Sequence, residues 1–160
     1  MGLDACVYCD CYEKGLMRTA PPQPELVYVD ENGQVSLKWE IPGADQHAFY
    51  SWLEEACDHG PLGEIVSHRL GNISGIGFLR HLLSQTEKCF PVLLAKVIYS
   101  GAHAGGALSL DEAARLRPEL DRLREVHCQD AGDERFVRRF ERQMSELVEV
   151  SLKIGKPIVF

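Results

Sequence analysis

Hydrophobic and polar residues alternate at the start of the chain and again around residues 25–39. Every second residue from Leu3 to Cys11 is apolar or cysteine, which predicts a strand over Leu3–Tyr12 with one buried face. The same alternation flanks the segment Glu31-Asn32-Gly33. An Asn-Gly pair accepts the positive φ angles of a tight turn. We therefore expect a β-hairpin here, with strands over residues 25–30 and 34–39.

Apolar residues spaced three and four apart predict four helices. A serine or aspartate stands where two of them begin, and Ser109-x-x-Glu112 has the spacing of a capping box. Pro118 is expected to kink or restart the third helix, and Gly155 to end the fourth. The predicted helices run from Asp45 to about Cys57, from Ile76 to Leu83, from Ser109 to about His127, and from Asp133 to Ile154.

Three further segments have shorter patterns. Residues 64–70 predict a strand, residues 71–77 a tight connection and residues 157–160 an edge strand. The apolar run of residues 90–99 predicts a central strand, although a short helix gives the same run. Together the pattern predicts a single α+β domain over residues 1–160. We expect a mixed, mostly antiparallel sheet with helices packed on one side and a long C-terminal amphipathic helix.

The composition indicates a packed globular protein, with 45% hydrophobic and 26% charged residues among 160. The formal net charge of −7 disfavours nucleic acid as a partner and favours a basic one, although solubility alone accounts for such a charge in many proteins. The first residues show no basic segment followed by an apolar run, and no stretch is apolar for the length of a membrane span. We therefore expect a cytoplasmic protein without membrane contact.

The first candidate for chemistry is the cluster Cys6-x-x-Cys9-x-Cys11, because thiolates bind zinc or exchange disulfides. As an alternative to a protein without cofactors, it predicts a zinc site made of Cys6, Cys9, Cys11 and His59. On a regular strand Cys6 points away from the other two cysteines, so convergence requires a bulge or turn. Cys57 beside His59, or Cys128 beside His127, could complete the site. The competing interpretation is buried small side chains.

The second candidate is the segment from Tyr99 to Gly106, where a predicted strand gives way to a helix. Tyr99, Ser100 and His103 offer two hydroxyls and an imidazole that titrates near neutral pH. His103 is the residue on which we place binding first. With the glycine-rich segment of residues 71–77, this loop also suggests a small-ligand regulatory module. Four carboxylates are further candidates for partner contacts: Asp10, Glu13, Asp111 and Glu112.

Three segments carry a resemblance: MGLDACVYCDCYEKG, KVIYSGAHAGGALSLDEAARL and FVRRFERQMSELVEVSLKIGKPIVF. They resemble a group of small uncharacterised bacterial proteins, and the middle one is similar to segments in immunity proteins of bacterial polymorphic-toxin systems. The resemblance implies a non-enzymatic inhibitor that binds a basic toxin domain through acidic side chains. The alternatives are a small metal- or thiol-dependent enzyme that uses the cysteine cluster and His103, and the small-ligand module.

Overall fold

A computed structural model describes residues 2–85, 89–101 and 106–160 and shows an α+β fold. Its main sheet has four strands in the order β4-β1-β6-β5, and every neighbouring pair is antiparallel. The long pair, β1 and β4, is the centre of the fold, and the two short strands extend the sheet on the other side of β1. The strands are β1 (Gly2–Tyr8), β4 (Glu64–Asn72), β5 (Ala107–Leu108) and β6 (Ile158–Val159).

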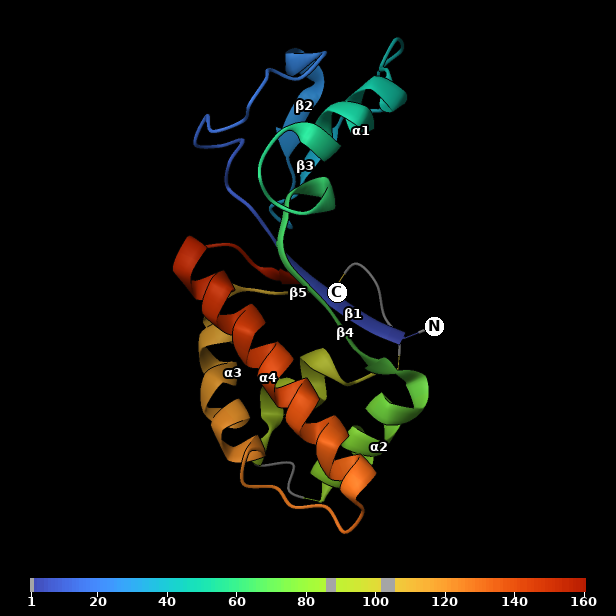
Figure 1. Cartoon of the computed structure of the whole chain (residues 1–160), viewed down its shortest axis with the longest axis vertical. Coiled ribbons are helices and arrows are strands. Elements are labelled where there is room, and N and C mark those ends of the chain that lie inside the picture. Colours follow the sequence, from blue (N-terminus) through green and yellow to red (C-terminus); the bar gives the residue numbers. More distant parts are fainter. Residues whose placement is uncertain (1, 86–88, 102–105) are drawn as a thin grey trace.

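Three helices pack together on one face of this sheet (Figure 1). They are α2 (Ile73–Ser84), α3 (Leu110–Leu123) and α4 (Ala131–Ile154). Their apolar stripes and the inward side chains of β1 form the main core, in which Leu3, Val7 and Phe140 are fully buried. Because side chains alternate along a strand, Cys6 and Tyr8 occupy the opposite face. We call this sheet with its helices the body.

The chain leaves the sheet after Tyr8 and returns at Glu64, and these two residues pair across β1 and β4. Residues 9–63, which we call the module, lie beyond this end of the strands, away from the helices of the body (Figure 1). The module holds a hairpin of β2 (Val27–Val29) and β3 (Val35–Leu37), helix α1 (Gln46–Glu55), and the short helices η1 (Pro24–Leu26) and η2 (Pro61–Gly63). It has a small core of its own: Val27, Val35, Leu37, Phe49 and Leu53.

The clearest local signals of the sequence are confirmed. The hairpin forms around Glu31-Asn32-Gly33, and Asp45 caps α1 by accepting a hydrogen bond from the backbone N–H of Ala48 at 2.9 Å. Ser109 and Glu112 form both hydrogen bonds of a capping box at the start of α3. Gly155 ends α4 in the left-handed conformation, with φ of 73°. The α+β class and the long amphipathic C-terminal helix are likewise confirmed.

The predicted central strand over residues 90–99 is wrong, because this segment is helical around η4 (Leu93–Val97). The carboxylate of the buried Glu119 accepts hydrogen bonds from the backbone N–H groups of Val92 and Leu93, each at 2.9 Å. A side chain on α3 thereby caps the first turn, which the local apolar run could not reveal.

The last strand is not at an edge, as the sequence pattern suggested. Ile158 pairs with Leu108 and Val159 with Cys6, so β6 lies between β1 and β5. The edge of this side of the sheet is β5, a two-residue strand that no pattern in the sequence marked.

Residues 71–77 do not form a connecting loop, because β4 extends to Asn72 and α2 begins at Ile73. Asn72 caps the helix by accepting a hydrogen bond from the N–H of Gly75 at 2.8 Å. A Cβ atom added at Gly71 or Gly75 would lie within 3.0 Å of the ring of Phe136. The glycines therefore allow α4 to pack closely against this junction. In α3 the chain passes through Pro118 without a new helix starting.

Candidate metal centre

Four potential metal ligands meet where the module joins the body. Cys9 and Cys11 directly follow β1, and Cys57 and His59 follow α1 on the returning chain. Their ligand atoms, three Sγ atoms and one imidazole nitrogen, all lie within 4.8 Å of one another. The segment that leaves the body and the segment that returns to it therefore contribute two ligands each.

Two of the distances between ligand atoms match those of a tetrahedral zinc site. With Zn–S bonds of about 2.3 Å and Zn–N bonds of about 2.0 Å, tetrahedral angles place two sulfurs about 3.8 Å apart and a sulfur and nitrogen about 3.5 Å apart. The Sγ atoms of Cys9 and Cys57 are 3.9 Å apart, and Sγ of Cys11 lies 3.4 Å from Nδ1 of His59. A disulfide would require about 2.05 Å between sulfurs. All three cysteines are free thiols in this structure.

Backbone hydrogen bonds fix the two ligand-bearing segments against each other. The N–H of Cys9 donates to the carbonyl of Gly63 at 2.8 Å, and the N–H of Arg18 donates to the carbonyl of Ala56 at 2.7 Å. Gly63 has φ of 78°, and a Cβ atom there would lie 3.3 Å from Sγ of Cys9. Only glycine accommodates both the left-handed backbone and this close approach without strain.

The three cysteines are buried and form a small cluster of their own, while His59 is the most exposed of the four. Burial raises the pKa of the Cys9 thiol to about 12, and the neighbouring Cys57 and Cys11 add to the rise, which a hydrogen bond from the backbone N–H of Cys11 opposes. The pKa of Cys11 is also raised, first by burial and then by Cys57. A raised pKa favours the protonated thiol, which is a weaker nucleophile than the thiolate.

The structure brings together three of the four residues expected from the sequence, Cys9, Cys11 and His59, and it corrects the fourth. Cys6 is not in the cluster, because it lies within β1, and Cys57 stands in its place. Burial raises the pKa of Cys6, which hydrogen-bonds to Tyr8 on the same face of the strand. The strand ends at Tyr8, and the turn after it lets Cys9 and Cys11 converge, as a continuous strand to Tyr12 would not.

The structure describes only some of the candidate residues expected at the loop of residues 99–106. His103 lies outside the described residues. Tyr99 is exposed and Ser100 half-buried, and both lie directly after η4. The candidate site at this loop therefore stays a prediction.

The four candidate carboxylates have structural partners or helix positions. Asp10 forms an ion pair with Lys14, and Glu13 with Lys156. Glu112 completes the capping box and contacts Lys96 at 3.1 Å, while Asp111 stands in the first turn of α3. Asp10 and Glu13 belong to the module next to the cysteine cluster, whereas Asp111 and Glu112 belong to the body.

Comparisons with protein-family models, with curated proteins and with solved structures found no significant match for this chain. Of the helices that the structure describes, none combines the length and the apolar character needed to cross a membrane.

Proposed function

We propose that this chain is a zinc-binding protein in which one Zn²⁺, held by Cys9, Cys11, Cys57 and His59, joins the two ends of the module where they meet the body. The observation that carries the proposal is the convergence of these four ligand atoms within 4.8 Å from segments about fifty residues apart. Three soft thiolates and one imidazole form a ligand set that zinc prefers, and four-coordinate zinc sites are almost always tetrahedral. Such a compact set fits a single ion, whereas the ligands on opposite irons of an iron–sulfur cluster stand farther apart.

The ligand number favours a structural ion. Catalytic zinc keeps a coordination position open for water or substrate, whereas four protein ligands close the tetrahedron. A thiol-dependent enzyme is disfavoured by the same cluster, because a nucleophilic cysteine needs an accessible thiol with a lowered pKa, and Cys9 and Cys11 are buried with raised pKa values.

The small size of the module gives a physical reason for a stabilising metal ion. Its own core has five buried hydrophobic residues, and a unit of this size with so small a core is marginally stable without a metal, a disulfide or a partner. The ion would join the point where the chain leaves β1 to the segment where it returns. Metal binding would thereby supply part of the folding free energy of the module.

The test is the metal content of the protein purified without chelators, measured by plasma mass spectrometry together with that of two cysteine variants. The wild type and Cys6→Ser are expected to carry about one equivalent of zinc. Cys57→Ser is expected to bind far more weakly and to lose its zinc on dialysis against a mild chelator. Cys6 is the matched control, because it is a half-buried cysteine of the same chain outside the cluster.

Equal zinc content in Cys57→Ser and wild type would reject this ligand set. A wild type without zinc that cannot be loaded with Zn²⁺ under reducing conditions would reject the proposal as a whole. The resemblance to toxin-immunity proteins stays a prediction, and a growth-rescue assay with the product of a neighbouring gene is its test.

A further inference from the structure

The net charge of the protein is concentrated in the module. Residues 9–63 contain ten acidic and three basic side chains, a balance of −7, whereas the rest of the sequence contains fourteen of each sign. Two of the three basic side chains of the module, Lys14 and Arg18, are in ion pairs with Asp10 and Asp58. The module therefore presents an acidic surface on an otherwise neutral protein.

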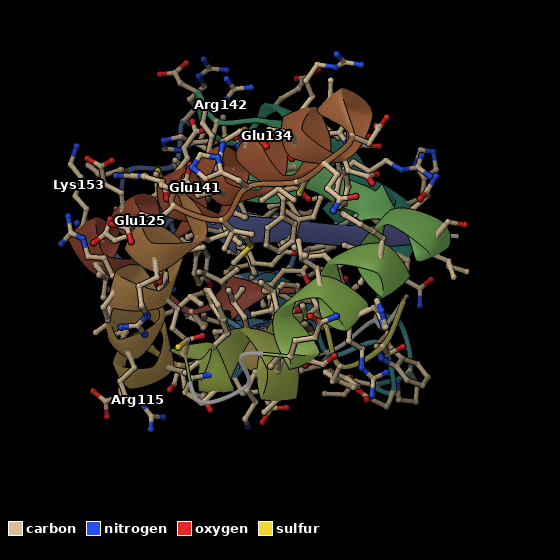
Figure 2. The ribbon with its side chains drawn as sticks, turned by 90° about the horizontal axis from the view of Figure 1, so that it is seen from below. Arg115, Glu125, Glu134, Glu141, Arg142 and Lys153 are labelled. Atoms are coloured by element: carbon tan, nitrogen blue, oxygen red, sulfur yellow. The ribbon has the colours of Figure 1, made fainter. Side chains whose placement is uncertain are left out.

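The body has no comparable excess of one charge. Figure 2 views it from below Figure 1 and shows labelled side chains of both signs around α3 and α4. Arg124 pairs with Glu141 at 2.8 Å, and Arg138 pairs with Glu134 at 2.9 Å. Charges on this face neutralise one another locally, so they produce little field at a distance.

The acidic module also carries a groove between its hairpin and α1. The groove has a volume of about 220 Å³. Three aromatic side chains line it: Tyr28 on β2, Trp39 after β3 and Tyr50 on α1. They are 40%, 64% and 51% exposed. The floor of the groove reaches the small core at Val35, Leu37 and Phe49.

The side chain of Trp39 is exposed, whereas that of the second tryptophan, Trp52, is packed into the module. The indole N–H of Trp52 donates to the carbonyl of Thr19 at 3.0 Å, and its ring packs against Tyr12 and Phe49. Trp39 has no side-chain hydrogen bond or ring contact within the described part of the chain. Exposed tryptophan and tyrosine around a groove are typical of the energetic centres of protein interfaces.

The charges next to the groove select the chemistry of what could bind there. Glu40 follows Trp39 in the sequence, and both Glu31 and Glu40 are exposed. Asp30 accepts a hydrogen bond from the hydroxyl of Ser36, which lines the groove. No charged residue of either sign is among the residues lining the groove, and Lys38 and Glu40 stand on either side of Trp39 in the sequence. Aromatic faces attract guanidinium and ammonium groups, and the net negative charge of the module favours cations near them.

We propose that this aromatic groove binds a basic polypeptide segment of a partner protein. Arginine side chains would stack on Trp39, Tyr28 or Tyr50, while exposed carboxylates of the module, such as Glu31 and Glu40, would pair with further cationic groups. The charge of the module would also steer such a partner toward the groove. The inference is independent of the metal proposal, because it rests on residues of the hairpin and α1 rather than on the cysteine cluster.

The experiment measures fluorescence anisotropy of a labelled decapeptide of alternating glycine and arginine, with the glycine–lysine and glycine–glutamate peptides as comparisons. Wild type is expected to bind the arginine peptide best and the glutamate peptide not at all up to about 1 mM. Raising the salt from about 20 mM to about 300 mM should weaken binding severalfold, because exposed charges are screened.

Two pairs of variants locate the site. Trp39→Ala is expected to weaken binding about tenfold or more, whereas Ile73→Ala, which truncates an exposed side chain of the body, should leave it unchanged. Glu31→Gln with Glu40→Gln should weaken binding at low salt by about threefold to tenfold. Glu125→Gln with Glu149→Gln removes the same charge from the body and should change it less than twofold, on the order expected for screened distant charges.

In Trp39→Ala the remaining Trp52 reports whether the module stays folded, since its fluorescence depends on packing between α1 and the loop at Thr19. Three results would each overturn the proposal. These are equal binding of the arginine and glutamate peptides, full affinity in folded Trp39→Ala, and an equal loss in the two charge variants. A variant that keeps its zinc but loses peptide binding, or loses zinc and still binds the peptide, would show that the groove and the metal site act independently.

Discussion

Lys156 forms an ion pair with Glu13 across the junction of the body and the module. Lys156 directly follows the glycine that ends α4, and only 8% of its side chain is exposed. Its Nζ atom also donates to the carbonyl of Gly33 in the hairpin turn at 3.3 Å. The residue after the long helix thus contacts both the loop after Cys11 and the hairpin, which attaches the module to the body.

Replacing Lys156 should loosen this attachment mainly through lost packing. Lys156→Ala is expected to lower the free energy of unfolding by about 1–3 kcal/mol, because a buried stem and its hydrogen bond are removed. Lys156→Met keeps the stem and should cost less, since Glu13 is half exposed and can be solvated. Hydrogen exchange of residues 27–37 and urea unfolding would check the order. A larger loss in Lys156→Met than in Lys156→Ala would contradict it.

Two glycine-to-alanine substitutions should change the stability of the protein in opposite directions. Gly63→Ala forces a side chain into a left-handed backbone next to Sγ of Cys9, and should destabilise the protein by roughly 1 kcal/mol or more and weaken metal binding. Gly77 lies inside α2 with open space around its Cα. Gly77→Ala should therefore stabilise the protein by about 0.5–1 kcal/mol. Thermal unfolding of both variants, with zinc content for Gly63→Ala, is the measurement, and a stabilised Gly63→Ala would refute the argument.

The capping box of α3 should make part of the stability depend on pH. The backbone N–H of Ser109, followed by Lys96 and the Ser109 hydroxyl, lowers the pKa of Glu112 below its ordinary value of 4.5. A carboxyl whose pKa is lower in the folded state adds stability that is complete above the unfolded pKa and is lost as the pH falls through the folded pKa. Glu112→Gln should therefore flatten the decline of stability between about pH 5 and pH 3.

Ser109→Ala is the companion variant, because it removes the other half of the same cap. It should cost about 1 kcal/mol at neutral pH. Urea unfolding at several pH values would follow both variants. An unchanged pH dependence in Glu112→Gln would show that this carboxylate does not contribute to acid stability.

Removing the metal should act on the module more than on the body. Treatment with a strong zinc chelator under reducing conditions is expected to shift the Trp52 emission to longer wavelength and to open residues 9–63 to proteases, because the small core loses its staple. Helices α2, α3 and α4 belong to the main core, so most of the helical circular dichroism should persist. Simultaneous collapse of all signals would show that module and body unfold as one unit.

The sequence predicts the elements whose information is local. The hairpin at Asn32-Gly33, the capping box at Ser109 and the end of α4 at Gly155 each depend on residues within a few positions of one another. The strand predicted from the apolar run of residues 90–99 is wrong because the helical form depends on Glu119, which is distant in the sequence. The prediction of an edge strand at the C-terminus is wrong for the same reason, because the two residues of β6 carry no signal for the strands beside them.

The candidate site could be predicted in part. Cys9 and Cys11 lie close in the sequence, but their spacing to Cys57 and His59 is set by the whole module. The pattern Cys-x-Cys followed by Cys-x-His was available as a signal, yet the alternation from Leu3 to Tyr12 suggested a continuous strand and favoured Cys6 equally. The groove around Trp39 was not predictable, because the alternation of the hairpin does not show which aromatic side chains remain exposed.

The most direct test of the account is zinc X-ray absorption spectroscopy of the purified protein. We predict a four-coordinate ion with three sulfur neighbours at about 2.3 Å and one imidazole nitrogen at about 2.0 Å, and two sulfurs with one imidazole in Cys57→Ser loaded with one equivalent of Zn²⁺ and not dialysed. The Cys6→Ser protein should give the wild-type spectrum. Coordination dominated by oxygen, or a sulfur count that falls in Cys6→Ser and not in Cys57→Ser, would contradict the proposed centre.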